Sequence, residues 1–248
     1  SSALPTQLSR HQITVLIVAL MTTAMGQSLV FAILAPLGRE VRLGELQITS
    51  IIAISALVFG LAAPAWGRLS DRVGRKPVII TGLLGYTLGT LCFTSVFYAG
   101  LTGALAGTAL YTTLLVARCS QSLIMSATSP ASTAYAADHT GRETRTATMA
   151  RLGTANSIGT ILGPAVSGAL ATFGLLAPLY FAAGMAAMAA MLVWRQLPLT
   201  PAGELSSRRV RARLRATDPR IRMYLATAVG LFVGFSGIQQ TLGFQLQD

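Results

Sequence analysis

The sequence predicts an all-α integral membrane protein, and two observations support that prediction. Hydrophobic residues make up 52% of the 248 residues and charged residues only 11%, which is less than half the charged share of a typical soluble domain. Apolar runs of about 20 residues recur along the chain, and a helix of that length crosses a hydrocarbon core of about 30 Å. The runs do not alternate apolar and polar residues, so a membrane β-barrel is not expected.

Seven of these apolar runs are predicted to span the membrane. In chain order they are Ile13–Ala35, Ile48–Trp66, Pro77–Tyr98, Thr102–Ser126, Thr148–Ala171, Leu176–Trp194 and Tyr224–Phe244. The fourth has the least defined end, because apolar sequence continues to Ala137.

The polar segments divide these spans into unequal groups. Residues 1–194 are predicted to form a six-helix bundle, and residues 195–222 an Arg-rich cytoplasmic linker. Residues 223–248 then hold a seventh helix without a partner. A lone helix after a finished bundle is interpreted as the start of a second bundle, so the chain is expected to be a fragment.

The basic residues predict the orientation. Sixteen Lys and Arg residues fall in the connections on the side of the N-terminus, against only Arg39 and Arg42 on the opposite side. Basic connections stay in the cytoplasm, which places the N-terminus inside. Because the charge lies in a few short connections, a nucleic-acid partner is not expected, and the linker arginines are interpreted as a solvated segment that sets topology rather than as an anionic-lipid or nucleic-acid patch.

No cofactor, metal site or enzymatic activity is predicted. Cys92 and Cys119 lie in separate apolar runs, and His11 and His139 are isolated in the sequence, which argues against a disulfide framework or a metal site. The paired acids or Ser/His pairs that an intramembrane hydrolase needs are not apparent either.

A charged stretch that contains two glycines joins the second and third spans. It begins at Gly67, ends at Pro77 and includes Asp71, Arg72, Gly74, Arg75 and Lys76. Glycine permits close approach and unusual dihedral angles, proline suits the first turn of a helix, and an acid among arginines favours ion pairs. A very tight cytoplasmic hairpin is therefore expected.

This stretch resembles the signature loop of the major facilitator superfamily, G-x-L-S/A-D-R-x-G-R-K/R, and it lies between spans two and three as in that family. The resemblance implies a twelve-helix fold made of two six-helix bundles, and transport by alternating access. It also implies that Asp71, Arg72 and Arg75 form a cytoplasmic latch with the second bundle.

The fourth span carries Arg118, the only ionisable residue well inside the first six spans. An ionisable group at membrane depth indicates a functional role, here in a cavity or in coupling, although a structural hydrogen bond or snorkelling would also account for it. Helical spacing places five residues on one face: Tyr111, Leu114, Leu115, Arg118 and Ser122. Arg118 and Gln121 are similar to the family's R-x-x-Q-G motif, with Ser122 in place of the glycine.

The fifth span contains Gly159, Gly163, Pro164 and Gly168. Their spacing is similar to the G-x-x-x-G-P-x-x-x-G pattern of the drug:proton antiporter branch, which exports its substrates. Small residues recur every four positions and predict a smooth face for helix contact, which generic packing would also explain: Ala155, Gly159, Gly163 and Ser167. Pro164 lacks an N–H and frees the carbonyl of Thr160, so a bend is expected there.

Three amides complete the candidate substrate site. Gln27 in span one is a candidate contact of the substrate or of Arg118, and Asn156 and Gln239 lie near the middle of spans five and seven. Buried amides equally serve as interhelical hydrogen bonds worth about 1 kcal/mol.

The sequence thus predicts a proton-coupled exporter of small organic molecules in a bacterial inner membrane, whose partners are substrate, protons, the lipid bilayer and a second six-helix half. No acid lies inside spans one to six, although a proton-coupled antiporter commonly has one. The acids are expected on the outer connection (Glu40, Glu45) and on cytoplasmic loops (Asp71, Asp138, Glu143). An importer of metabolites or sugars and a non-transporting membrane subunit remain alternatives.

Overall fold

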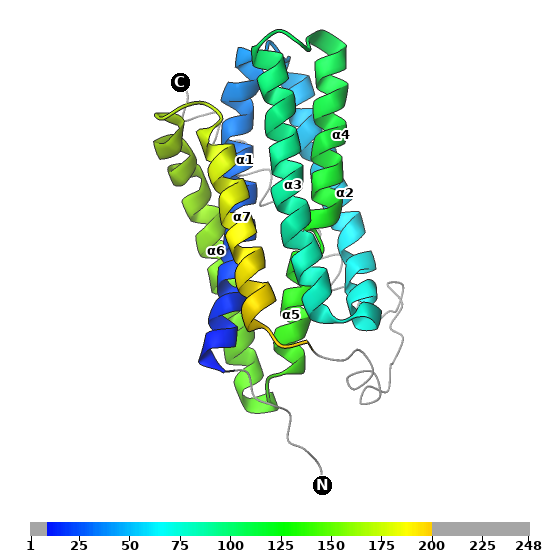
Figure 1. The fold of residues 1–248 in the computed structure, drawn as a ribbon, viewed down its shortest axis with the longest axis vertical. Coiled ribbons are helices and arrows are strands. Elements are labelled where there is room, and N and C mark those ends of the chain that lie inside the picture. Colours follow the sequence, from blue (N-terminus) through cyan, green and yellow to red (C-terminus); the bar gives the residue numbers. More distant parts are fainter. Residues whose placement is uncertain (1–8, 200–248) are drawn as a thin grey trace. The chain divides into compact units, whose positions relative to one another are not determined.

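The computed structural model describes residues 9–199, which form seven α-helices (Figure 1). They are α1 (Arg10–Glu40), α2 (Glu45–Val73), α3 (Arg75–Leu101), α4 (Gly107–Met125), α5 (Thr128–Asp138), α6 (Arg142–Ala171) and α7 (Ala177–Gln196). Among them, α1, α2, α3 and α7 are long and apolar enough to cross a membrane. The predicted seventh span and all but the start of the Arg-rich linker lie outside the described residues.

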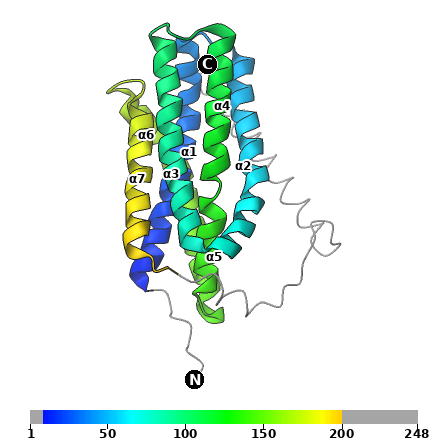
Figure 2. The same cartoon turned by 45° about the vertical axis from the view of Figure 1, so that its right-hand side comes forward.

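The helices run side by side, and most of the main packing partners are not neighbours along the chain, the pair α3 and α4 excepted (Figures 1 and 2). Helix α1 packs mainly on α6 and α7, whereas α4 packs on α2 and α3. Helix α3 also packs on α7, so it lies between α4 and α7. Helices α1 and α3 from the first part of the chain therefore pack against the last helices, α6 and α7.

The predicted fourth span, Thr102–Ser126, ends where α4 ends, and the apolar sequence after it forms a separate helix, α5. Helix α4 begins at Gly107, later than the predicted start at Thr102, and after a turn at residues 126–127 the chain continues as α5 to Asp138. Pro130, the third residue of α5, has no N–H to donate to the carbonyl of Ser126 and suits the first turn of a new helix. The apolar sequence that continues to Ala137 is thus helical.

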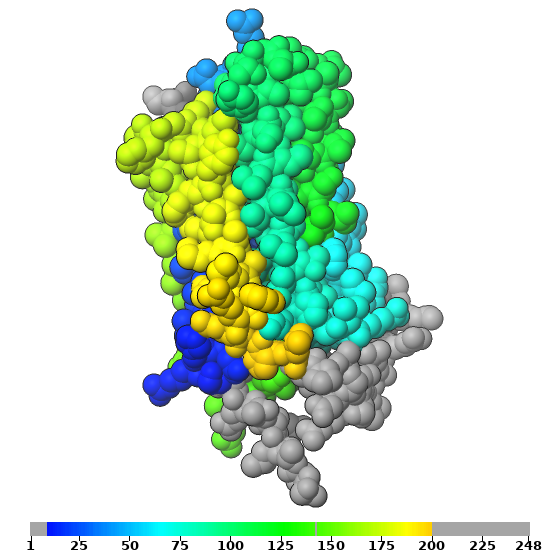
Figure 3. Space-filling model, in the orientation of Figure 1, coloured from blue at the N-terminus to red at the C-terminus, as the bar shows by residue number. Residues whose placement is uncertain are grey.

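The outer face of α3 and α7 is rich in exposed apolar side chains. These two helices form much of the face shown in Figure 3. Their exposed large side chains include Leu84, Leu88, Leu91, Met188, Met191 and Trp194. In water such a surface would mark an interaction site; in a bilayer it is the surface that lipid tails cover.

Candidate functional site

The signature stretch is not a loop in the structure, because helices run through nearly all of it. Helix α2 continues to Val73, seven residues past the predicted end at Trp66, and α3 starts at Arg75. Only Gly74 lies between them, with φ 106° and ψ 155°, a conformation that favours glycine. Beyond the apolar layer a helix needs no apolar side chains, so the end of the hydrophobic run does not mark the end of the helix. A Cβ at Gly67 would meet nothing nearer than 3.9 Å.

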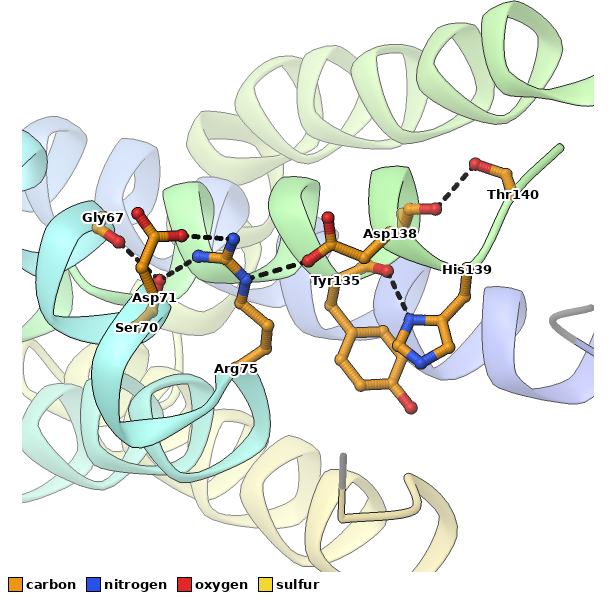
Figure 4. Close-up of polar contacts among 9 residues, drawn as sticks. Gly67, Ser70, Asp71, Arg75, Tyr135, Asp138, His139 and Thr140 are labelled. Atoms are coloured by element: carbon orange, nitrogen blue, oxygen red, sulfur yellow. Dashed lines mark hydrogen bonds and ion pairs between the residues drawn. The ribbon is translucent and has the colours of Figure 1, made fainter. Parts of the chain in front are cut away.

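Arg75 is the centre of a buried polar network at this junction (Figure 4). Its Nη2 lies 2.5 Å from Asp71 Oδ1, its Nε donates to Asp138 Oδ2 at 3.1 Å, and its Nη1 donates to Ser70 Oγ at 2.5 Å. Arg75 is only 7% exposed, and the Asp138 side chain 1%. All three guanidinium nitrogens are used, and they join α2, α3 and α5.

Asp138 is a member of this network that the sequence analysis missed. It was expected on a cytoplasmic loop, but it is the last residue of α5, and Glu143 likewise lies in the first turn of α6. Glu40, expected on the outer connection, is the last residue of α1. The partner of Asp138 is 63 positions away in the sequence, so no local motif shows the pair. In Figure 4 the neighbouring His139 stacks on Tyr135, and its Nδ1 lies 2.9 Å from the Tyr135 carbonyl oxygen.

Two further basic residues of the stretch, Lys76 and Arg72, have different surroundings. Lys76 is buried, and its Nζ donates to the carbonyl of Trp194 at 2.7 Å. That carbonyl belongs to the last turn of α7, where a cation is favourable. Arg72 is exposed on the last turn of α2. Lys76 therefore joins α3 to the end of α7 within the bundle. Arg72, by contrast, is accessible to other parts of the protein.

Arg118 lies fully buried in the interior of the bundle, not at a helix end. Its Nη1 donates to Gln121 Oε1 at 2.6 Å, and Gln121 Nε2 donates to Thr90 Oγ1 at 2.5 Å. The guanidinium carbon lies 5.4 Å from the centre of the Phe31 ring and 6.0 Å from that of Phe93. Arg118 is thus held by one hydrogen bond and two cation–π contacts, and its role in transport stays a prediction.

Tyr111, predicted to share a helix face with Arg118, forms its hydrogen bond with another helix. The hydroxyl of Tyr111 lies 2.8 Å from Ser50 Oγ on α2 and joins α4 to that helix. Tyr111 is two turns away from Arg118 on α4, so a shared face does not bring the two side chains together. The aromatic neighbours of the guanidinium come from α1 and α3 instead, as Phe31 and Phe93.

Two of the three predicted amides lie within the described residues, and neither is hydrogen-bonded to Arg118 there. Gln27 is half-buried on α1, and the described residues contain no hydrogen bond between it and Arg118, whose Nε and Nη2 have no partner there. Asn156 is exposed on α6. Gln239 lies outside the described residues, as does its neighbour Gln240.

The smooth face predicted on α6 is confirmed and packs on α1. A Cβ at Gly159 would lie 2.5 Å from the carbonyl oxygen of Met21, and one at Gly163 would lie 2.7 Å from that of Met25. Ala155 and Ser167 on the same face are also buried. In contrast, a Cβ at Gly168 would meet nothing within 4 Å, so this glycine is not part of the contact.

A hydroxyl from α1 compensates for the proline of α6. Pro164 cannot donate to the carbonyl of Thr160. Ser28 Oγ donates to that carbonyl instead, at 2.6 Å. Helix α6 runs through the proline from Arg142 to Ala171. In a bilayer an unsatisfied carbonyl costs several kcal/mol. The Ser28 hydroxyl therefore removes the penalty that Pro164 would otherwise cause at the Thr160 carbonyl.

Replacement of Thr90 by Val is expected to destabilise the bundle. The change keeps the side-chain shape but leaves the buried amide N–H of Gln121 without an acceptor, which costs about 1–3 kcal/mol. Replacement by Ser keeps the acceptor and should have a much smaller effect. Thermal unfolding of the three proteins in detergent measures the difference, and equal stability of the Val and Ser variants would contradict the assigned hydrogen bond.

The fold and these motifs define a multi-helix membrane protein. Comparison with known proteins identifies its family. Residues 16–247 match the family model of the Major Facilitator Superfamily. The chain therefore belongs to the major facilitator superfamily.

Its relatives include bacterial resistance proteins. Multidrug resistance protein 2 of Bacillus subtilis is 31% identical over 172 residues, which cover 67% of this chain and 39% of that protein. The class E tetracycline resistance protein of Escherichia coli is 30% identical over 228 residues, which cover 90% of this chain and 53% of that protein. The chain thus spans about half the length or less of these relatives.

A solved structure shares the fold. The human organic anion transporter MFSD10 (TETRAN) aligns with a TM-score of 0.59 at 24% identity, over 78% of this chain and 49% of that one. At this identity the likeness supports the fold alone, and it agrees with the predicted six-helix half of a twelve-helix major facilitator fold.

Proposed function

We propose that this chain is the N-terminal half of a proton-coupled exporter of small organic molecules. The observation that carries the proposal is the seam between α1 and α6, where Gly159 and Gly163 of the antiporter-type pattern contact α1 directly. At the same seam, Ser28 of α1 donates to the Thr160 carbonyl that Pro164 leaves free. The multidrug and tetracycline resistance proteins among its relatives support the same direction of transport.

The proposal assigns a part to each polar centre. The Arg75 network holds the cytoplasmic ends of α2, α3 and α5 in register. The exposed Arg72, together with Asp71, then contacts the second bundle and favours the outward-facing state. Arg118 acts in substrate binding or coupling, and the proton-carrying acid belongs to the second bundle. The N-terminus lies in the cytoplasm of a bacterial cell, and residues 195–222 form the linker on that side.

An efflux assay tests this proposal. Cells that express the complete gene product should accumulate less of a fluorescent amphiphilic compound than control cells, and a proton uncoupler should abolish the difference. The seam variant Gly163→Leu serves as an inactive control, because its side chain cannot fit beside Met25. Unchanged efflux after uncoupling would contradict proton coupling, and greater accumulation than in control cells would favour an importer.

A further inference from the structure

The guanidinium of Arg118 has one free edge inside the bundle. Its Nη1 is bonded to Gln121, whereas Nε and Nη2 are buried without any partner among the described residues. Nε–H and Nη2–H point from the same edge of the planar group and form the fork that fits the two oxygens of a carboxylate. The bond to Gln121 thus holds Arg118 by the opposite edge and leaves this fork unused.

The positive charge of Arg118 also lacks a counter-ion in the described part of the chain. The two ion pairs found there both belong to Arg75. The acids of residues 9–199 lie at or near helix ends: Glu40, Glu45, Asp71, Asp138 and Glu143. The rings of Phe31 and Phe93 stabilise the cation partly, but a buried charge with two unpaired donors is costly. The two unpaired donors and the uncompensated charge therefore favour binding of an anion that accepts hydrogen bonds from Nε and Nη2.

A second unsatisfied donor lies on the helix that holds this network. The hydroxyl of Tyr86 on α3 is buried without a hydrogen-bond partner among the described residues. Tyr86 is one turn before Thr90, whose Oγ1 donates to the Tyr86 carbonyl at 2.7 Å. The hydroxyl is closely packed against α1, because a Cβ at Gly26 would collide with it. Helix α3 therefore offers another hydrogen-bond donor between α1 and α4.

The Phe31 ring of α1 lies next to the Arg118 guanidinium. The Phe31 ring is only half-buried, and half-buried Gln27 lies one turn earlier on the same face of α1. Helices α1 and α4 have their main packing partners elsewhere in the bundle. Because Arg118 is fully buried, a substrate would reach the fork only after the side chains that cover it move.

We propose that the free fork of Arg118 binds the carboxylate of the transported molecule, so that the substrates are organic acids with an apolar body. This inference rests on the proposed transport function. The aromatic rings of Phe31 and Phe93 then contact the apolar part of the substrate, and Gln121, held by Thr90, sets the direction of the fork.

The test uses the complete chain in lipid nanodiscs, with isotope-labelled arginine and benzoate as the probe. Benzamide has the same shape without the charge and is the matched control molecule. We expect benzoate to shift the Nε–H resonance of one arginine, identified by its proximity to the ring protons of Phe31 and Phe93, and benzamide to leave it unchanged. Arg118→Lys keeps the charge but loses the fork, and should bind benzoate at least about tenfold more weakly.

The outcomes separate this inference from the proposed function. An Arg118 resonance that does not move at millimolar benzoate would overturn the carboxylate site, whether or not Arg118→Lys folds. Equal benzoate affinity of Arg118→Lys would also overturn it, since charge alone would then suffice. Proton-dependent export of uncharged compounds that benzoate does not inhibit would contradict the inference and leave the exporter standing. A benzoate-dependent shift without any proton-dependent export would support the site and contradict the exporter.

Discussion

Replacement of Gly159 by Ala is expected to destabilise the bundle, although alanine is the better helix former. The new Cβ would lie 2.5 Å from the carbonyl oxygen of Met21 and 3.0 Å from the amide nitrogen of Met25. Both are backbone atoms, so no side-chain rotation relieves the overlap and α1 and α6 must separate. Overpacking of this kind costs about 1–3 kcal/mol. Gly163→Ala should behave alike, since its Cβ would meet Met25 and Ser28 at 2.7 Å.

Gly168→Ala is the matched control on the same helix and in the same sequence pattern. Its Cβ would have no atom within 4 Å, so only the helix preference of alanine over glycine remains, which stabilises by up to about 1 kcal/mol. The two substitutions therefore have opposite expected signs. Thermal unfolding in detergent, followed by circular dichroism, compares them. Equal unfolding temperatures for Gly159→Ala and Gly168→Ala would contradict the close contact of α1 and α6.

Replacement of Asp138 by Ala is the second change with a large expected effect. The Asp138 carboxylate is almost fully buried and accepts from Arg75 Nε. Without it, the buried guanidinium keeps only Asp71 and Ser70 as partners. Removal of one member of a buried ion pair costs about 3–5 kcal/mol. We expect a clear fall in the unfolding temperature and loosening of the cytoplasmic ends of α2, α3 and α5.

Glu143→Ala provides the comparison for Asp138→Ala. Glu143 is also acidic and lies five residues later, but it is exposed in the first turn of α6. Its loss removes only a favourable interaction with the helix N-terminus, which is small at an exposed site. Hydrogen exchange at the ends of α2 and α3 distinguishes the variants. Similar exchange in both would show that the Arg75–Asp138 pair does not hold this junction together.

The location of the helices could be predicted from the sequence more easily than their ends. Apolar runs report where a chain crosses lipid, and the six spans within residues 9–199 each coincide with a helix. The runs do not report where helical hydrogen bonding stops. For this reason α2 extends past Trp66 through charged residues to Val73, and the break at residues 126–127 lies within continuous apolar sequence.

The candidate site was predictable only in part. Arg118 was identified because an ionisable residue within an apolar run is unusual, and its bond to Gln121, three residues later, follows from helical spacing. Tyr111 has the same helical spacing, but its hydroxyl lies beside Ser50 on α2, and its part in the substrate site stays a prediction. Phe31 and Phe93 carried no signal, since phenylalanine is expected anywhere in an apolar run.

The sequence by itself determined the membrane class, the tight connection between the second and third spans and the small-residue face of α6, because each depends on residues close together in the chain. Only the tertiary structure decided which distant groups meet. Thr90 with Gln121, Arg75 with Asp138, and Ser28 with the Thr160 carbonyl are separated by 31, 63 and 132 positions. Spacing along one helix fixes which side chains share a face. The partner of that face is set by how the helices pack, through glycine contacts and buried polar groups that must be satisfied.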